Sequence, residues 1–192
     1  MTEEFDFIGI GDVVTDAFVN LDSVSIVPQD QGPDMMCMAY GDKIPFNWHK
    51  IVEGVGNSAN GSVSATRLGL KTAYVANVGD DTYGEGQVAA LKANGVDTQF
   101  IAVHPGEKSN YHYVISHKAD RTILVKHTEY NYTLPDIGNP KWIYRSSLAE
   151  NSQPHQLEIA QYVKERPETN LAFQPGTFQM KLGVEQLKDV YE

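Results

Sequence analysis

Residues 54–98 read GVGNSANGSVSATRLGLKTAYVANVGDDTYGEGQVAALKANGVDT, and the order of helix, glycine and strand signals in this stretch decides the fold. The pattern predicts a helix over 57–68 that ends at a glycine. A strand over 73–78 follows, and then a second helix over 83–94 that also stops at a glycine. Because helices alternate with short apolar strands, we predict βαβ units and a mostly parallel sheet in an α/β fold.

The first of these helices has a weak apolar face, formed by Ala59, Val63, Thr66 and Leu70. Most of its other residues are small, and small residues let a helix approach its neighbours closely. We therefore expect this helix to be packed against the sheet rather than displayed to solvent.

The rest of the predicted sheet comes from both ends of the chain. An apolar run over 5–10 is expected to form the first strand, and it stops at Gly11-Asp12. The final third is predicted to add strands over 142–144 and 171–173 and helices over 154–166 and 184–191.

Residues 13–52 show no helical period and carry turn signals between short runs, so we predict several short strands outside the main sheet there. A second segment, residues 98–127, is also predicted to be extended, with Tyr111, Tyr113 and Ile115 alternating with polar neighbours. The second segment is predicted to contain a hairpin that turns at Lys118-Ala119-Asp120.

The composition limits the classes of protein that fit. The chain has 192 residues, 15 Lys and Arg against 25 Asp and Glu, and a formal net charge of −10. A surface this acidic repels nucleic-acid phosphates and anionic lipids, so neither is an expected partner. The apolar runs are short and the start is acidic, which predicts a soluble cytoplasmic protein. The six histidines are scattered, and we expect no metal site from their spacing.

The glycines before the first helix suggest a ligand site. Glycine lets a ligand approach the backbone, and a helix start offers free N–H groups. Asn57 and Asn60 are three residues apart, so both amides can face one side of the first turn, where they would suit sugar hydroxyls. The alternative is that Asn57 only caps the helix and the glycines only make a tight turn. Spacing alone does not separate the two.

Asp16 lies near the carboxyl end of the first predicted strand. Ligands of open α/β sheets bind outside that edge, and a carboxylate there can accept two hydroxyl hydrogen bonds. An ordinary surface aspartate is the competing interpretation. A dinucleotide site is not expected, because Val14 occupies the third glycine position of that fingerprint and no helix follows.

Taken in order, four motifs resemble the amino-terminal signature of the ribokinase-like (PfkB) carbohydrate kinase family. They are Gly11 with Asp16, then Gly56-Asn57-Ser58-Ala59-Asn60 with Arg67-Leu68-Gly69, then Val78-Gly79-Asp80-Asp81 with Gly84, and finally Gly95-Val96-Asp97-Thr98. The resemblance implies a three-layer α/β/α domain with a small β-lid formed by 13–52 and about 98–127. It also implies a lid that closes over the sugar and often joins two copies as a homodimer.

The resemblance assigns roles to individual residues. Asp16 would hold sugar hydroxyls, and Asn60 would match the family's helix asparagine. Gly56 and Asn57 would lie at the glycine-rich hinge that approaches the sugar, with Gly54 also at the substrate site. On the predicted lid, Tyr111 and Tyr113 are candidates to stack on a sugar or a base. The family transfers the γ-phosphate of ATP to a hydroxyl with the help of Mg²⁺ and an aspartate general base.

The sequence departs from the family pattern in several places. The family's paired glycine appears as Val55-Gly56, with Gly54 one place earlier, which leaves the closing motion or the alignment by one residue open. Val14 replaces an asparagine of ribokinases, which argues against ribose, and Gln174 stands where many members have asparagine. The carboxy-terminal signature Asp-Thr-x-Gly-Ala-Gly-Asp is absent. We therefore expect the general base and most of the ATP and Mg²⁺ sites beyond residue 192, with no catalytic residue in this chain, which would be the amino-terminal part of the kinase domain.

The expected function is ATP-dependent phosphorylation of a sugar hydroxyl, with this chain supplying the sugar-binding half and the lid. One alternative is a nucleoside kinase of the same fold. The other is a non-catalytic protein that keeps the cleft and lid for sugar binding or assembly.

Overall fold

The computed structural model describes residues 4–191, which divide into two compact units. The first, here called the core unit, is formed by 4–15, Glu53–Asn110 and 127–191. The second, here called the inserted unit, is formed by Asp16–Val52 and Tyr111–Lys126. Residues 13–15, 98–110 and 127, which the family resemblance included in the lid segments, belong to the core unit. Residues 98–110 contain β7 (Ile101–His104), which pairs with the main sheet, so that part of the expected lid is wrong.

A five-stranded parallel sheet forms the centre of the core unit, in the order β11-β10-β1-β6-β7. Its strands are β1 (Phe7–Ile10), β6 (Thr72–Gly79), β7 (Ile101–His104), β10 (Trp142–Arg145) and β11 (Asn170–Phe173). The α/β class and the parallel sheet predicted from the glycine punctuation are confirmed. Every residue of β6 is buried, as expected of a strand covered on both faces.

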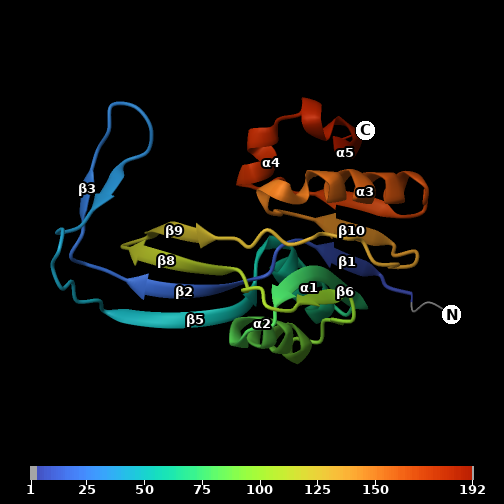
Figure 1. The fold of residues 1–192 in the computed structure, drawn as a ribbon, viewed down its shortest axis with the longest axis horizontal. Helices are drawn as coiled ribbons and strands as arrows, with labels where there is room; N and C mark the ends of the chain where they lie inside the picture. The colour runs from blue at the N-terminus through green and yellow to red at the C-terminus, as the bar shows by residue number, and fades with distance from the viewer. Residues whose placement is uncertain (1–3, 192) are drawn as a thin grey trace. The chain divides into compact units, whose positions relative to one another are not determined.

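Helices cover both faces of this sheet (Figure 1). On one face lie α1 (Asn57–Arg67) and α2 (Thr82–Ala93), where Ala59 and Leu91 pack with Tyr74 of β6. On the other face lies α3 (Gln153–Lys164), whose Ile159 packs with Ile8 and Ile143. The short 3₁₀ helix η1 (Glu150–Ser152) leads into α3. The three-layer arrangement expected from the family resemblance is therefore present.

The buried face of α1 differs from the predicted one. Its buried residues are Ser58, Ala59, Ser62 and Ala65, whereas Leu70 lies beyond the helix and is 43% exposed. The reason is close packing: a Cβ atom added at Gly9 would lie 2.2 Å from Ser62 Oγ, and one at Gly61 would lie 2.8 Å from the Tyr144 ring. Small residues on both sides bring α1 closer to the sheet than an apolar stripe would allow.

The carboxy-terminal region also differs from the prediction of one helix over 184–191. It contains α4 (Thr177–Leu182), the 3₁₀ helix η2 (Glu185–Leu187) and α5 (Lys188–Tyr191). Gly183 has a φ of 80° at the end of α4 and interrupts the helical path. Helix α4 was not predicted, because its residues directly follow Pro175-Gly176, a pair that signals a turn.

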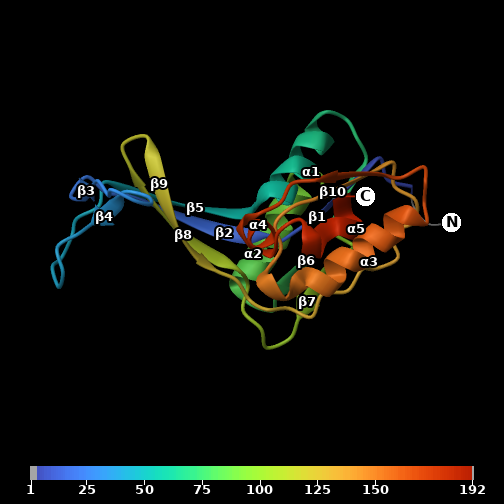
Figure 2. The same cartoon turned by 90° about the horizontal axis from the view of Figure 1, so that it is seen from above.

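The inserted unit is a β-structure, as predicted for the segments outside the main sheet. One sheet has the order β5-β2-β8-β9, and β3 pairs with β4 in a separate antiparallel ribbon (Figure 2). The strands are β2 (Val14–Asn20), β3 (Ser25–Val27), β4 (Met35–Cys37), β5 (Trp48–Val55), β8 (Tyr111–His117) and β9 (Asp120–Lys126). The hairpin turn between β8 and β9 lies where it was predicted, with Lys118 at a φ of 53°.

Candidate substrate site

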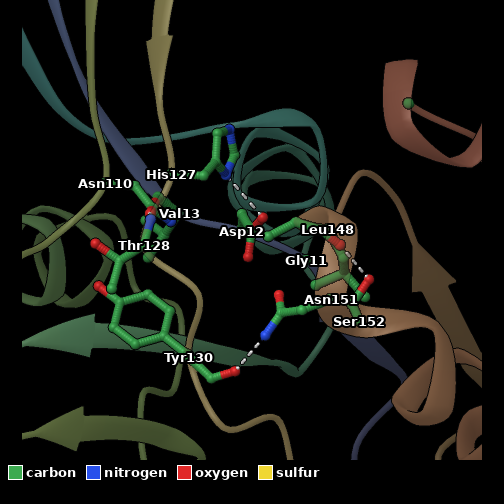
Figure 3. Close-up of polar contacts among 12 residues, drawn as sticks. Gly11, Asp12, Val13, Asn110, His127, Thr128, Tyr130, Leu148, Asn151 and Ser152 are labelled. Atoms are coloured by element: carbon green, nitrogen blue, oxygen red, sulfur yellow. Dashed lines mark hydrogen bonds and ion pairs between the residues drawn. The ribbon is translucent and has the colours of Figure 1, made fainter.

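The carboxyl end of β1 carries a buried carboxylate. The Asp12 side chain is 4% exposed, and His127 Nδ1 lies 3.0 Å from Asp12 Oδ2 (Figure 3). The Tyr132 hydroxyl donates a hydrogen bond of 2.9 Å to Asp12 Oδ1. Asp12 therefore joins the end of β1 to residues 127–132, the segment that follows residue 126. Burial and the Asp12 charge raise the pKa of Tyr132, so its hydroxyl stays protonated as a donor.

A buried histidine lies behind this cluster. The His155 ring stacks on the Tyr132 ring at 5.7 Å, and His155 Nδ1 lies 3.0 Å from Glu158 Oε2. Burial lowers the pKa of His155 and outweighs the raising effect of Glu158. The neutral imidazole is thus the form that the folded protein accommodates.

This predicts a loss of stability in mild acid. Because the folded-state pKa of His155 lies below the unfolded value, its contribution is complete above about pH 6.5 and is lost as the pH falls from there. We expect the free energy of unfolding to fall between pH 7.5 and 5.5, and His155→Gln to reduce that slope. Urea titrations at both pH values measure it. His49→Gln removes an exposed histidine from β5 as a control, and an equal loss of slope there would contradict the prediction.

The start of α1 is led by two glycines in conformations that other residues rarely adopt. Gly54 has a φ of 69° and Gly56 a φ of 129°. Gly56 occupies the N-cap position and Asn57 is the first helical residue, so the alternative in which Asn57 caps the helix is wrong. Asn57 and Asn60 are both exposed on the first turn. Their amides are available to a ligand at this end of the helix.

A buried serine pair fixes this helix start to the sheet. Ser58 Oγ donates a 2.8 Å hydrogen bond to Ile10 O, and the Ser58 amide donates one of 3.0 Å to Ser146 Oγ. Both serines are fully buried or nearly so. The pair ties α1 to the carboxyl ends of β1 and β10, which holds Asn57 and Asn60 at the edge where ligands of α/β sheets bind.

The Gly79-Asp80-Asp81 motif has a structural role. Asp81 caps α2 by accepting a hydrogen bond of 3.0 Å from the Gly84 amide, and it accepts another of 3.1 Å from the Ser109 amide. Burial alone would raise the pKa of Asp81, but the hydrogen bonds from Ser109 and Gly84 outweigh it and lower the pKa. A Cβ atom at Gly79 would lie 2.4 Å from Glu107 O, so the glycine permits a close backbone contact.

In the inserted unit, Asp16 lies on β2 with His112 of the neighbouring β8 beside it. His112 Nδ1 is 3.2 Å from Asp16 Oδ1, and both side chains are largely buried. Successive residues of a strand point to opposite faces, so Tyr111 and Tyr113 share the face opposite His112. Their rings meet at 5.2 Å. Whether they contact a sugar depends on which face meets it, and that role stays a prediction.

The structure therefore gathers Gly54, Gly56, Asn57 and Asn60 at the start of α1 in the core unit, whereas Asp16, Tyr111 and Tyr113 belong to the inserted unit. The sequence analysis did not single out His112, Asp12 or His127. The alternation of Tyr111, His112 and Tyr113 would have placed His112 on its own face of the strand. No local signal linked Asp12 to His127, which lies 115 residues away in the sequence.

An all-parallel α/β sheet with a glycine-led helix at its carboxyl edge defines a class of proteins that bind small ligands at that edge. Comparison with protein families narrows the class. Residues 49–180, more than half of the chain, match the pfkB family carbohydrate kinase. The chain belongs to this family.

Individual relatives match parts of the chain. It is 37% identical to a ribokinase of Bacillus subtilis over 70 residues, which cover 36% of this chain and 24% of the relative. It is 28% identical to a fructokinase of Vibrio alginolyticus over 131 residues, or 64% of this chain and 43% of the relative. The chain thus spans less than half the length of these curated relatives.

Solved structures share the fold at low sequence identity. Ribokinase of Arabidopsis thaliana, complexed with ribose and ATP, matches with a TM-score of 0.68 at 15% identity, over 89% of this chain and 53% of that one. A nucleoside kinase of Methanocaldococcus jannaschii matches with a TM-score of 0.68 at 16% identity, over 96% of this chain and 57% of that one. The fold alone does not separate sugar from nucleoside kinases.

Two classes of feature are absent from the part of the chain that the structure describes. Among residues 4–191, no group of three or more His, Cys, Asp or Glu side chains could hold a metal ion. None of the helices in that range has the length and apolarity needed to cross a membrane.

Proposed function

We propose that the protein phosphorylates a sugar hydroxyl with ATP and that this chain supplies the sugar-binding half and the lid. The observation that carries the proposal is the family match over residues 49–180, which includes the glycine-led start of α1. Relatives that share this region include ribokinases and fructokinases. Because the M. jannaschii nucleoside kinase has the same fold, a nucleoside is the competing substrate.

The proposed sugar contacts follow from hydrogen-bond chemistry. The Asp16 carboxylate can accept hydrogen bonds from two hydroxyls, and the exposed amides of Asn57 and Asn60 can donate and accept others. Gly54 and Gly56 have positive φ angles that turn the chain into the start of α1, and their missing side chains make room for Gln87 O and Asp12 O of the protein itself. The carboxylate and the two amides would bind and orient a polyol.

The groups that carry out phosphoryl transfer would belong to the family's carboxy-terminal signature, which the sequence does not contain. In that arrangement ATP supplies the phosphoryl group and Mg²⁺ neutralises its charge. Residues 1–192 would hold the acceptor sugar and close over it, and would not complete the transfer alone.

A coupled ADP-release assay tests the function. The complete protein is offered D-ribose, D-fructose, 2-dehydro-3-deoxygluconate and adenosine, each with ATP and Mg²⁺. ADP release that depends on a sugar supports the proposal, and release that depends only on adenosine replaces it with a nucleoside kinase. Thermal stabilisation by a sugar without any ADP release would support the non-catalytic alternative. Turnover by residues 1–192 alone would contradict the division of roles.

We also propose that the inserted unit acts as the lid and joins two copies. Its edge strand β9 is exposed along its whole length and carries adjacent apolar side chains, Ile123, Leu124 and Val125, at 42–54% exposure. An exposed apolar edge strand is unfavourable unless it is covered. We expect a homodimer in solution by light scattering, and a shift to monomer for Leu124→Lys. A monomeric mass for the unsubstituted protein would contradict the proposal.

A further inference from the structure

The chain passes between the two units four times, at residues 15–16, 52–53, 110–111 and 126–127. The core-unit side of these crossings meets one buried side chain of α2. Gln87 is fully buried, and its Nε2 donates to Thr15 Oγ1 at 3.1 Å and to Asn110 O at 3.0 Å. A single amide thus binds the last core residue before two of the crossings.

Asn110 extends the contact to a third crossing. Its carbonyl accepts a hydrogen bond of 3.2 Å from the Thr15 amide, and its side-chain Nδ2 donates to Val13 O at 3.3 Å. Its Oδ1 accepts a hydrogen bond of 2.8 Å from the Thr128 amide. Asn110 is 1% exposed, so water does not compete strongly for these bonds.

The remaining crossing packs directly on the backbone of α2. A Cβ atom at Gly54 would lie 2.9 Å from Gln87 O and 3.0 Å from Ala90 Cβ. Only glycine, which has no side chain, lets β5 pass this close to α2. Three crossings are thus hydrogen-bonded to Gln87, directly or through Asn110, and the fourth packs against the same turn of α2.

From these contacts we infer that Gln87 is a positioning residue for the proposed sugar site. It fixes both the hydroxyl and, through Asn110, the amide of Thr15, and the next residue in the chain is Asp16. The inference rests on the proposed function, because it takes Asp16 as the sugar contact. Small displacements of a binding group reduce catalysis strongly.

The chemistry of Gln87 favours positioning over simple filling of space. Burying an amide costs free energy that an apolar side chain of similar size would not. Its Oε1 has no hydrogen-bond partner among the described residues, so the two N–H donations are the interactions that the amide makes. Those donations fix two crossings at once, which an apolar side chain cannot do.

The test uses substitutions at both ends of one hydrogen bond in the complete protein. Gln87→Met keeps the length and removes the donors, and Thr15→Val removes the hydroxyl acceptor. For the best substrate of the sugar panel, we expect each variant to lower kcat/KM on the order of tenfold while the KM for ATP stays within about twofold. The double variant should lose little more than Gln87→Met alone, because Gln87→Met already removes the bond to Thr15. Thr15→Ser keeps the hydroxyl and should retain most of the unsubstituted value.

Amide hydrogen exchange separates failure of the inference from failure of the proposed function. Gln87→Met should speed exchange in residues 13–20, whereas Gln161→Met, an exposed glutamine on α3, should not. Unchanged exchange in Gln87→Met overturns the inference whatever the substrate is. Faster exchange in a protein that phosphorylates no sugar would overturn the proposed function and the sugar role of Gln87 together. If Gln87→Met raised the KM for ATP as much as the KM for the sugar, Gln87 would have only a structural role.

Discussion

Asp16→Asn is expected to lower sugar kcat/KM by about 100-fold in the complete protein and to leave the KM for ATP within about twofold. Hydrogen bonds to a charged group contribute about 1.5–3 kcal/mol each, and two of them would weaken when the carboxylate becomes an amide. The neighbouring His112, 3.2 Å away, would also lose its charged partner. Steady-state kinetics with the sugar and ATP varied separately measures both values.

The control for this variant is Asp22→Asn, which changes an exposed aspartate of the same inserted unit and should alter neither value. An unchanged sugar kcat/KM in Asp16→Asn would show that Asp16 does not contact the sugar. A parallel rise in the KM for ATP would show that the substitution acts on more than the sugar site.

Gly56→Ala is expected to reduce the free energy of unfolding by about 2–5 kcal/mol, or to prevent folding. Gly56 has a φ of 129°, which L-residues rarely adopt. An added Cβ atom would also lie 2.6 Å from Asp12 O, a backbone atom that cannot move without shifting the end of β1. Strain and overlap therefore act together at the start of the proposed sugar site. Urea unfolding followed by circular dichroism measures the loss.

Gly69→Ala separates these two causes. Gly69 has a φ of 92°, but no described atom lies within 4 Å of an added Cβ, so only the backbone strain is present. We expect this variant to lose about 1–2 kcal/mol. If both variants lost the same amount, the contact with Asp12 would not be the reason for the glycine at position 56.

The sequence predicted those parts of the fold that local signals specify. Glycines after short apolar runs marked β6 and α2 within a residue or two, and the order of motifs indicated the family. The buried face of α1 was not predicted, because it depends on residues distant in the sequence. Gly9 leaves room for Ser62, and the Tyr144 ring packs against Gly61. Close packing by small residues leaves no hydrophobic periodicity to detect.

The candidate site was predictable to the extent that it is local. The start of α1 was identified from consecutive residues, and Gly56 rather than Asn57 as the N-cap is a difference of one position. The pairs Asp12–His127 and Gln87–Asn110 were not predictable, because each joins residues that only the folded chain brings together. The sequence around a polar side chain does not indicate which distant residue it will contact.

The position of β1 at the centre of the parallel sheet has a consequence during synthesis. β1 is made before both of its neighbours, which begin only at Thr72 and Trp142. At ribosomal speeds the second neighbour follows on the order of ten seconds later. During that time β1 has no hydrogen-bonded neighbour on one side. Its Ile8 and Ile10, which are buried in the folded protein, are then not yet covered. Until Trp142 is made, the open side of β1 is therefore an edge at which another molecule could pair.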